Sequence, residues 1–210
     1  MPVAINGTSG VITGVATGGL PDGIVDTDML AAGAVTAAKR GSGAILQVQH
    51  VFKGDRFSTS STSWTDITNL SISITPSSSS NKILVMCHMG AAGVRQSNLD
   101  HGNGIRVMRD IGGAGYSNNH KLNGNADSNR DRITYRGVGW SYNGDHMPGG
   151  LGFSSVDDPS TTSAVTYKVQ VKCQDSSYAF YLNGNVSHGD SDHIIHSTSM
   201  TSFIAMEIAG

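Results

Sequence analysis

A strict two-residue alternation at residues 165–173 constrains the fold of this chain most. Apolar side chains occupy every second position: Val165, Tyr167, Val169, Val171 and Cys173. Polar residues stand between them. Side chains of an extended chain point alternately to its two sides, so this run predicts a strand with one apolar and one polar face. Within that strand we expect a charge at Val169 to abolish folding and one at Lys168 to be tolerated.

Several other segments have strand patterns of the same kind. We expect strands over residues 44–52, 70–75, 82–89, 133–142, 178–182 and 203–208. Residues 82–89 are apolar on both faces, which predicts a central, buried strand. Long polar loops are expected over residues 90–132 and 142–162, and loops of this length are often functional. The pattern as a whole predicts an all-β protein, an antiparallel β-sandwich or jelly roll.

Composition agrees with strands and tight turns. The chain has 210 residues, of which 27 are glycine, and only 14% are charged. It is too poor in strong helix formers for a helical protein and too apolar for disorder. The formal net charge of −2 argues against broad attraction to nucleic acid. No run approaches the roughly 20 apolar residues of a membrane helix, so no membrane insertion is expected.

Residues 1–43 differ from the rest of the chain. They are rich in glycine, contain no aromatic residue and hold only small apolar clusters. Such a segment cannot close a core alone, so we expect an extended stalk or attachment segment, ordered by packing against copies of itself or a partner. A short helix capped by Asp26 or Thr27 is expected within it. Residues 44–210 then form the head domain.

The two cysteines, Cys87 and Cys173, are expected to be buried free thiols. The amino-terminal residues have neither a basic region nor an apolar run, so no signal peptide is expected. The protein is therefore expected to be made in a cytoplasm.

Motifs for catalysis are missing from the sequence. It has no nucleophile elbow, no zinc-protease motif, no phosphate loop and no dinucleotide fingerprint, so we expect no enzymatic activity and no cofactor. Two segments are candidates for binding a metal ion. His188, His193 and His196 lie close together, and one histidine per chain could meet at a trimer axis. Residues 123–131 carry Asn or Asp at every second position but lack the glycine and glutamate of a calcium loop.

Two stretches carry a resemblance to known proteins. Residues 41–76, GSGAILQVQHVFKGDRFSTSSTSWTDITNLSISITP, are similar to the start of the C-terminal β-domain of bacteriophage fiber proteins, especially those of marine phages (cyanophage type). The ending, STSMTSFIAMEIAG, resembles the last strand of those domains. The segment GIVDTDMLAAGAVTAAK resembles the stalks that precede fiber heads, and stalks of that family are trimeric. The middle of the chain matches no pattern of the family.

The resemblance implies a virion protein, a tail or head fiber, that adheres to the host surface. Its partners would be two further copies in a homotrimer, other virion proteins at the N-terminal segment, and a host-surface glycan or outer-membrane protein. An alternative is a capsid decoration or connector protein docked by its N-terminal arm. Receptor contact is expected in the two long loops, where polar and aromatic groups suit sugars. The candidate residues are Tyr116, Asn118, Asn119, Arg130 and Tyr142.

Overall fold

The computed structural model describes residues 4–6, 11–13, 35, 39–96, 102–138, 140–141, 149–184 and 197–210. The chain divides into two compact units, Met1–Gly41 and Ser42–Gly210. In the first, strands β1 (Ala4–Asn6) and β2 (Val11–Thr13) pair antiparallel. The helix expected near residues 26–32 lies outside the described residues.

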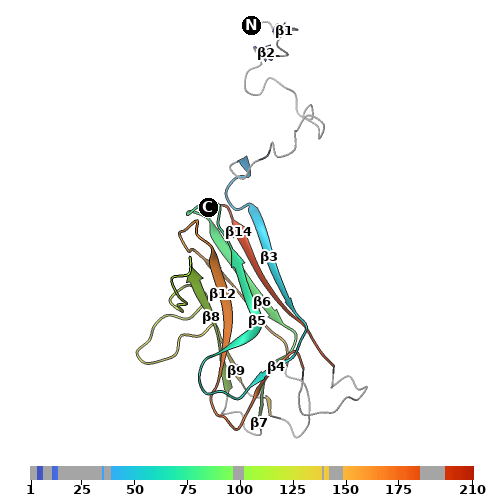
Figure 1. Ribbon diagram of the computed structural model, residues 1–210, viewed down its shortest axis with the longest axis vertical. Coiled ribbons are helices and arrows are strands. Elements are labelled where there is room, and N and C mark those ends of the chain that lie inside the picture. Colours follow the sequence, from blue (N-terminus) through green and yellow to red (C-terminus); the bar gives the residue numbers. More distant parts are fainter. Residues whose placement is uncertain are drawn as a thin grey trace. The chain divides into compact units, whose positions relative to one another are not determined.

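The second unit is an all-β sandwich, as predicted. One sheet has the order β11-β6-β14-β3, with bounds Leu151–Asp157, Lys82–Met89, Thr201–Ile208 and Ile45–Lys53. The other has the order β5-β12-β8-β9, with bounds Thr65–Ile74, Val165–Cys173, Gly102–Ile111 and Tyr135–Val138. Every pairing within the two sheets is antiparallel. The first strand of this unit, β3, lies beside its last strand, β14 (Figure 1). The chain crosses repeatedly between the two sheets, which is the arrangement of a jelly roll.

A third, smaller sheet has the order β10-β7-β13-β4. Its strands are Trp140–Ser141, Ala92–Gln96, Phe180–Leu182 and Phe57–Thr59. Strands β4 and β7 lie at the end of the unit opposite the carboxyl terminus (Figure 1). Because Val94, Phe180 and Leu182 belong to the main core, this sheet extends the core at that end.

The core is built from the inward positions of all three sheets. Strand β12 alternates between buried and half-buried positions along its whole length, so the face assigned from its sequence is correct. Cys87 and Cys173 are both buried and unpaired, which confirms the expected free thiols. Burial raises the pKa of the Cys87 thiol to about 12, so it is an unreactive part of the core.

The two long loops expected from the sequence are a partial error. Residues 90–132 contain β7 and the ten-residue strand β8, and residues 142–162 contain β11. The segment 133–142 is two strands, β9 and β10, and not one. Strand β8 escaped detection because Gly102, Asn103 and Gly104 give its first half no apolar alternation. In β11 the alternation is broken because Ser155 and Asp157 stand at inward positions and Val156 at an outward one.

Candidate functional site

Two cations face each other across a glycine on the outer side of the β5-β12-β8-β9 sheet. Lys172 of β12 is the direct partner of Gly104 of β8, and Gly104 is the direct partner of Arg136 of β9. Directly opposed residues of antiparallel strands project to the same face. The row Lys172–Gly104–Arg136 therefore has charged side chains at both ends and none in the middle.

The ring of Trp64 covers this gap. Trp64 lies just before β5, and a Cβ atom added at Gly104 would stand 3.0 Å from its Cη2 atom. The hollow beside the ring has a volume of about 330 Å³, and its lining includes Trp64, Asp131, Arg136 and Lys172. We call it the Trp64 hollow. Its volume lies at the lower end of the range of small-molecule sites, roughly 300–1,000 Å³.

Asp131 fixes the geometry of the Trp64 hollow. Its Oδ1 accepts a long hydrogen bond of 3.4 Å from Trp64 Nε1, and its Oδ2 accepts one of 2.8 Å from Lys172 Nζ. The Lys172 hydrogen bond, opposed by partial burial, lowers the pKa of the Asp131 carboxyl. A carboxylate has lone pairs beyond these two contacts, so Asp131 retains the capacity to accept from a hydroxyl group.

A second cation stacks on the tryptophan. The guanidinium carbon of Arg106 lies 4.2 Å from the Trp64 ring centroid, within the range of a cation–π contact. Arg106 Nε also donates to Gln170 Oε1 at 2.8 Å. Burial lowers the pKa of Arg106, and the nearby charges of Asp131 and Asp66 act in the opposite direction. These contacts hold the indole in one orientation.

The same sheet face carries Tyr116, one of the residues predicted from the sequence to bind a receptor. Tyr116 is 42% exposed, and Lys168 Nζ lies 4.0 Å from its ring centroid. Lys168 also donates to Asp66 Oδ2 at 2.8 Å. Trp64 and Tyr116 thus form two aromatic platforms on one face of the sandwich, each with a cation against it.

The other predicted site residues lie in different surroundings. The carbonyl of Asn118 accepts from Asn123 Nδ2 at 3.1 Å, and Asn119 Oδ1 accepts from Arg132 Nη1 at 2.5 Å. Arg130 is exposed and pairs with Asp127. Tyr142 lies outside the described residues. Trp64 was not predicted to be a binding residue, because neither Gly104 nor Arg136 is near it in the chain.

The outer side of the β11-β6-β14-β3 sheet carries an apolar patch, bordered by a polar row of Ser202, His88 and Gly152 beside Phe52. Cross-strand partners form rows of side chains across all four strands. One row is Val48, Met206, Leu84 and Val156, and the next is His50, Ile204, Met86 and Ser154. Phe52 stands at the edge of a third row and is 63% exposed; Val48 is 52%, Val156 39% and Met86 37% exposed. We call this surface the apolar face; it consists of Val48, Phe52, Leu84, Met86, Val156, Ile204 and Met206.

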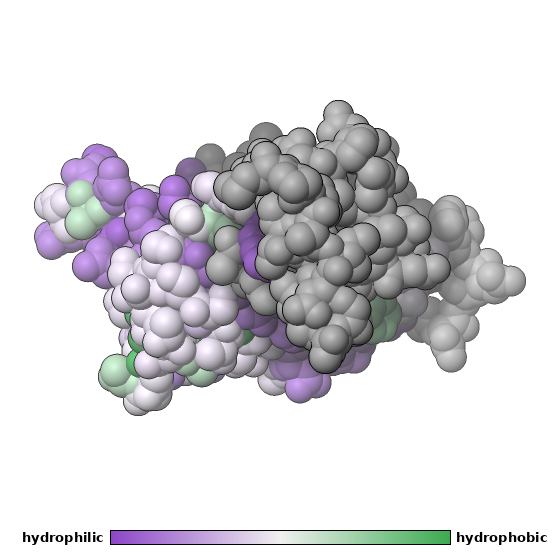
Figure 2. Space-filling model, turned by 90° about the horizontal axis from the view of Figure 1, so that it is seen from above, coloured by the Kyte–Doolittle hydropathy of each residue, from purple (hydrophilic) through white to green (hydrophobic). Residues whose placement is uncertain are grey.

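The end of the molecule seen in Figure 2 gives a contrast. Its coloured part is mainly hydrophilic to neutral, with small hydrophobic patches. Exposed apolar side chains in contiguous rows on a sheet mark interaction surfaces in soluble proteins. The apolar face is therefore a second candidate for function.

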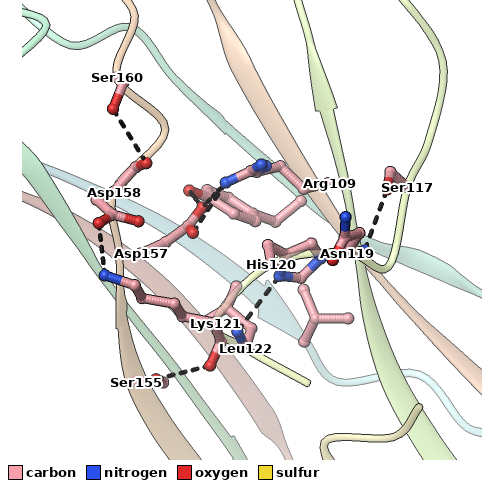
Figure 3. A network of polar contacts seen from close by, with 12 residues as sticks. Arg109, Ser117, Asn119, His120, Lys121, Leu122, Ser155, Asp157, Asp158 and Ser160 are labelled. Carbon is pink, nitrogen blue, oxygen red and sulfur yellow. Dashed lines mark hydrogen bonds and ion pairs between the residues drawn. The ribbon is translucent and has the colours of Figure 1, made fainter. Parts of the chain in front are cut away.

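A buried polar network joins the two sheets of the sandwich (Figure 3). Asp157, at the end of β11, is fully buried and accepts from Arg109 Nη1 at 2.9 and 2.8 Å and from the Tyr167 hydroxyl at 2.8 Å. Burial, and then the Asp157 charge, raise the pKa of Tyr167. His120 packs nearby, and burial lowers its pKa to about 4. Every group faces a partner inside the protein, so the network fastens the sheets and offers no open site.

Metal ligands do not gather in the described part of the chain. It holds no group of three or more His, Cys, Asp or Glu side chains placed to bind one ion. In the segment 123–131, Asp127 pairs with Arg130 whereas Asp131 pairs with Lys172, so the two carboxylates serve different cations. His188, His193 and His196 lie outside the described residues.

Comparison with protein-family models and with curated proteins finds no match for this chain. Among the described residues no helix has the length and apolar character needed to span a membrane.

Proposed function

We propose that this protein is a fiber protein of a bacteriophage virion, a tail or head fiber, whose trimeric β-sandwich head attaches the particle to the host surface. The sequence resemblance at residues 41–76 and at the carboxyl end supports this assignment, and the jelly-roll class of the head is compatible with it. The role is one of binding, with no catalytic step. The separate unit Met1–Gly41 is the segment that would dock on other virion proteins.

The apolar face is the observation that carries the proposal. Strand β6 has apolar residues on both faces, and only one face packs into the core of the single chain: Ile83, Val85, Cys87 and Met89 are buried. The other face presents Leu84 and Met86 beside apolar neighbours on β14. Exposing such rows to water is unfavourable by roughly 25 cal/mol for each Å² of apolar surface. Three copies that meet through this sheet would remove the surface from water.

In such a trimer the opposite sheets would face outward. The β5-β12-β8-β9 sheet, with Trp64 and Tyr116 on its outer side, would then be available to a receptor on each copy. A single contact of this size is weak, but several linked contacts raise the overall affinity through effective concentration.

Binding of the labelled full chain to host cells tests the proposal. We expect saturable binding, and we expect Met86→Lys to weaken it by about tenfold or more because a monomer loses multivalency. Met86 is 37% exposed in the single chain, so the lysine does not need to be buried there. Ser79→Lys, at an exposed turn position between β5 and β6, is the matched control and should bind as the parent does.

Thermal melts of both variants show whether the head stays folded. If the parent chain binds no host strain but remains on purified particles, the decoration or connector role replaces the fiber role. If Met86→Lys binds as tightly as the parent, adhesion does not depend on assembly through the apolar face.

A further inference from the structure

We propose that the Trp64 hollow binds a hexuronate unit, a sugar ring that carries a carboxylate, within an acidic surface glycan. This inference rests on the proposed adhesion function and names its ligand class and its site. It places the ligand on the sheet face between β12 and β9, and not in the loops expected from the sequence.

The shape of the hollow suits one edge of a sugar ring. Gly104 removes the side chain at the centre of the row, and Ile133 Cγ2 would stand only 3.4 Å from a Cβ atom placed there. The space is therefore closed by Trp64 on one side and Ile133 on another. The apolar C–H face of a sugar stacks on an indole as other apolar groups do, and the Arg106 stack and the Asp131 hydrogen bond already hold this indole in place.

The charges select an acidic ring. Lys172 and Arg136 flank the hollow and Asp131 is the one carboxylate in its lining. Lys172 is paired with Asp131, whereas exposed Arg136 has no ion pair within the described part of the chain. A guanidinium binds a carboxylate through two parallel hydrogen bonds. Asp131 would accept hydrogen bonds from ring hydroxyls. The sugar would therefore bind in one orientation, with its carboxylate toward Arg136 and its hydroxyls toward Asp131.

The experiment measures binding of defined oligosaccharides to the full-length protein in a Trp140→Phe background, so that Trp64 is the single fluorescent indole. The probes are trigalacturonate and trimannuronate. The fully methyl-esterified form of each keeps the ring and removes the charge. We expect at least one acidic probe to change the Trp64 fluorescence and to bind about tenfold or more tightly than its ester.

Three variants locate the site. Arg136→Gln should weaken the acidic probe by about tenfold or more, and Gly104→Val should abolish binding by filling the hollow. Arg40→Gln makes the same change at another exposed arginine, in the unit Met1–Gly41 outside the head, and should bind as the parent does. Because a side chain at position 104 would crowd the Trp64 ring, Arg136→Gln, at an exposed position, keeps the test independent of folding.

Each outcome decides between the claims. Three results would overturn the hexuronate site. They are equal binding of acid and ester, normal binding by Arg136→Gln, and no binding of either acidic probe at up to about 10 mM. Adhesion of the parent chain to host cells in any of those cases leaves the fiber function standing. Binding of the acidic probe with no adhesion to any host strain supports the site and contradicts the fiber function.

Discussion

At the scale of single residues, the interior of the sandwich depends on a few polar groups that are completely paired. Asp157 is the most critical of them, because a carboxylate at zero exposure is stable only when its charge is neutralised and hydrogen-bonded. Arg109 and Tyr167 supply both requirements, and they are direct partners in neighbouring strands. The network therefore links β11 of one sheet to β8 and β12 of the other.

Removing this carboxylate should destabilise the protein strongly. We expect Asp157→Ala to lower the free energy of unfolding by about 3–5 kcal/mol, because it leaves a partly buried guanidinium and a buried hydroxyl without partners. Asp158→Ala is the matched control, since the exposed pair of Asp158 with Lys121 contributes about 0–1 kcal/mol. Urea unfolding of the two variants measures the difference. Equal midpoints would contradict the account of the network.

His120 should make stability depend on pH. Burial lowers its pKa from 6.5 to about 4 in the folded protein, so between these values the unfolded chain binds a proton that the folded chain does not. The contribution of neutral His120 is therefore complete above about pH 6.5 and is lost as the pH falls to about 4, roughly 3 kcal/mol in total.

The measurement is the unfolding free energy of the parent and of His120→Asn across that range. We expect the parent to lose more unfolding free energy than the variant as the solution is acidified, because asparagine does not titrate. A difference that stays constant from pH 7 to pH 4 would mean that His120 titrates normally in the folded protein.

At the scale of the strands, prediction from the sequence was accurate where the apolar pattern is strong. Strand β12 has the bounds that its alternation predicted, residues 165–173, and strand β6 has the bounds of its apolar run, residues 82–89. Strand β8 was missed because its inward positions include Asn103 and Arg109 and its outward positions include two glycines. Those polar and glycine residues serve the Arg109 network and the Trp64 hollow, so local sequence rules fail where the strand carries other roles.

The face assigned to β12 can be tested with one pair of variants. Val169 has no exposed surface, so Val169→Asp should prevent folding, since an unpaired buried carboxylate costs several kcal/mol. Lys168 lies on the outer side, where the sequence predicts that an aspartate is tolerated. Because Lys168 contacts Asp66 and Tyr116, an aspartate there would lower the stability of the fold. Lys168→Gln is the better control, and we expect a loss of about 1 kcal/mol. Thermal melts that give similar stabilities for the two variants would show that the register is wrong.

The candidate site was less predictable than the strands. Tyr116 was identified because it is an aromatic residue in a polar segment, and it does lie on an exposed face. Lys172, Gly104 and Arg136 come together only through the register of three strands that are far apart in sequence. No local pattern encodes that register, so the Trp64 hollow required the structure.

At the scale of the whole molecule, the sandwich has two outer faces of opposite character. The β5-β12-β8-β9 sheet presents paired charges and aromatic rings, and the β11-β6-β14-β3 sheet presents the apolar face. The expectation that residues 82–89 are buried on both sides is wrong for the single chain, because Met86 and His88 on the outer side are exposed. In the single chain one side of β6 packs on the core, and the other side is left for a partner.

The mass of the full chain in solution tests the central claim most directly. At micromolar concentration, light scattering should give three times the chain mass of 21.9 kDa, because three apolar faces bury one another. Met86→Lys should shift the mass toward that of one chain while Ser79→Lys leaves it unchanged, with both variants still folded. A parent chain that scatters as a monomer, or a Met86→Lys variant that remains trimeric, would contradict assembly through the apolar face.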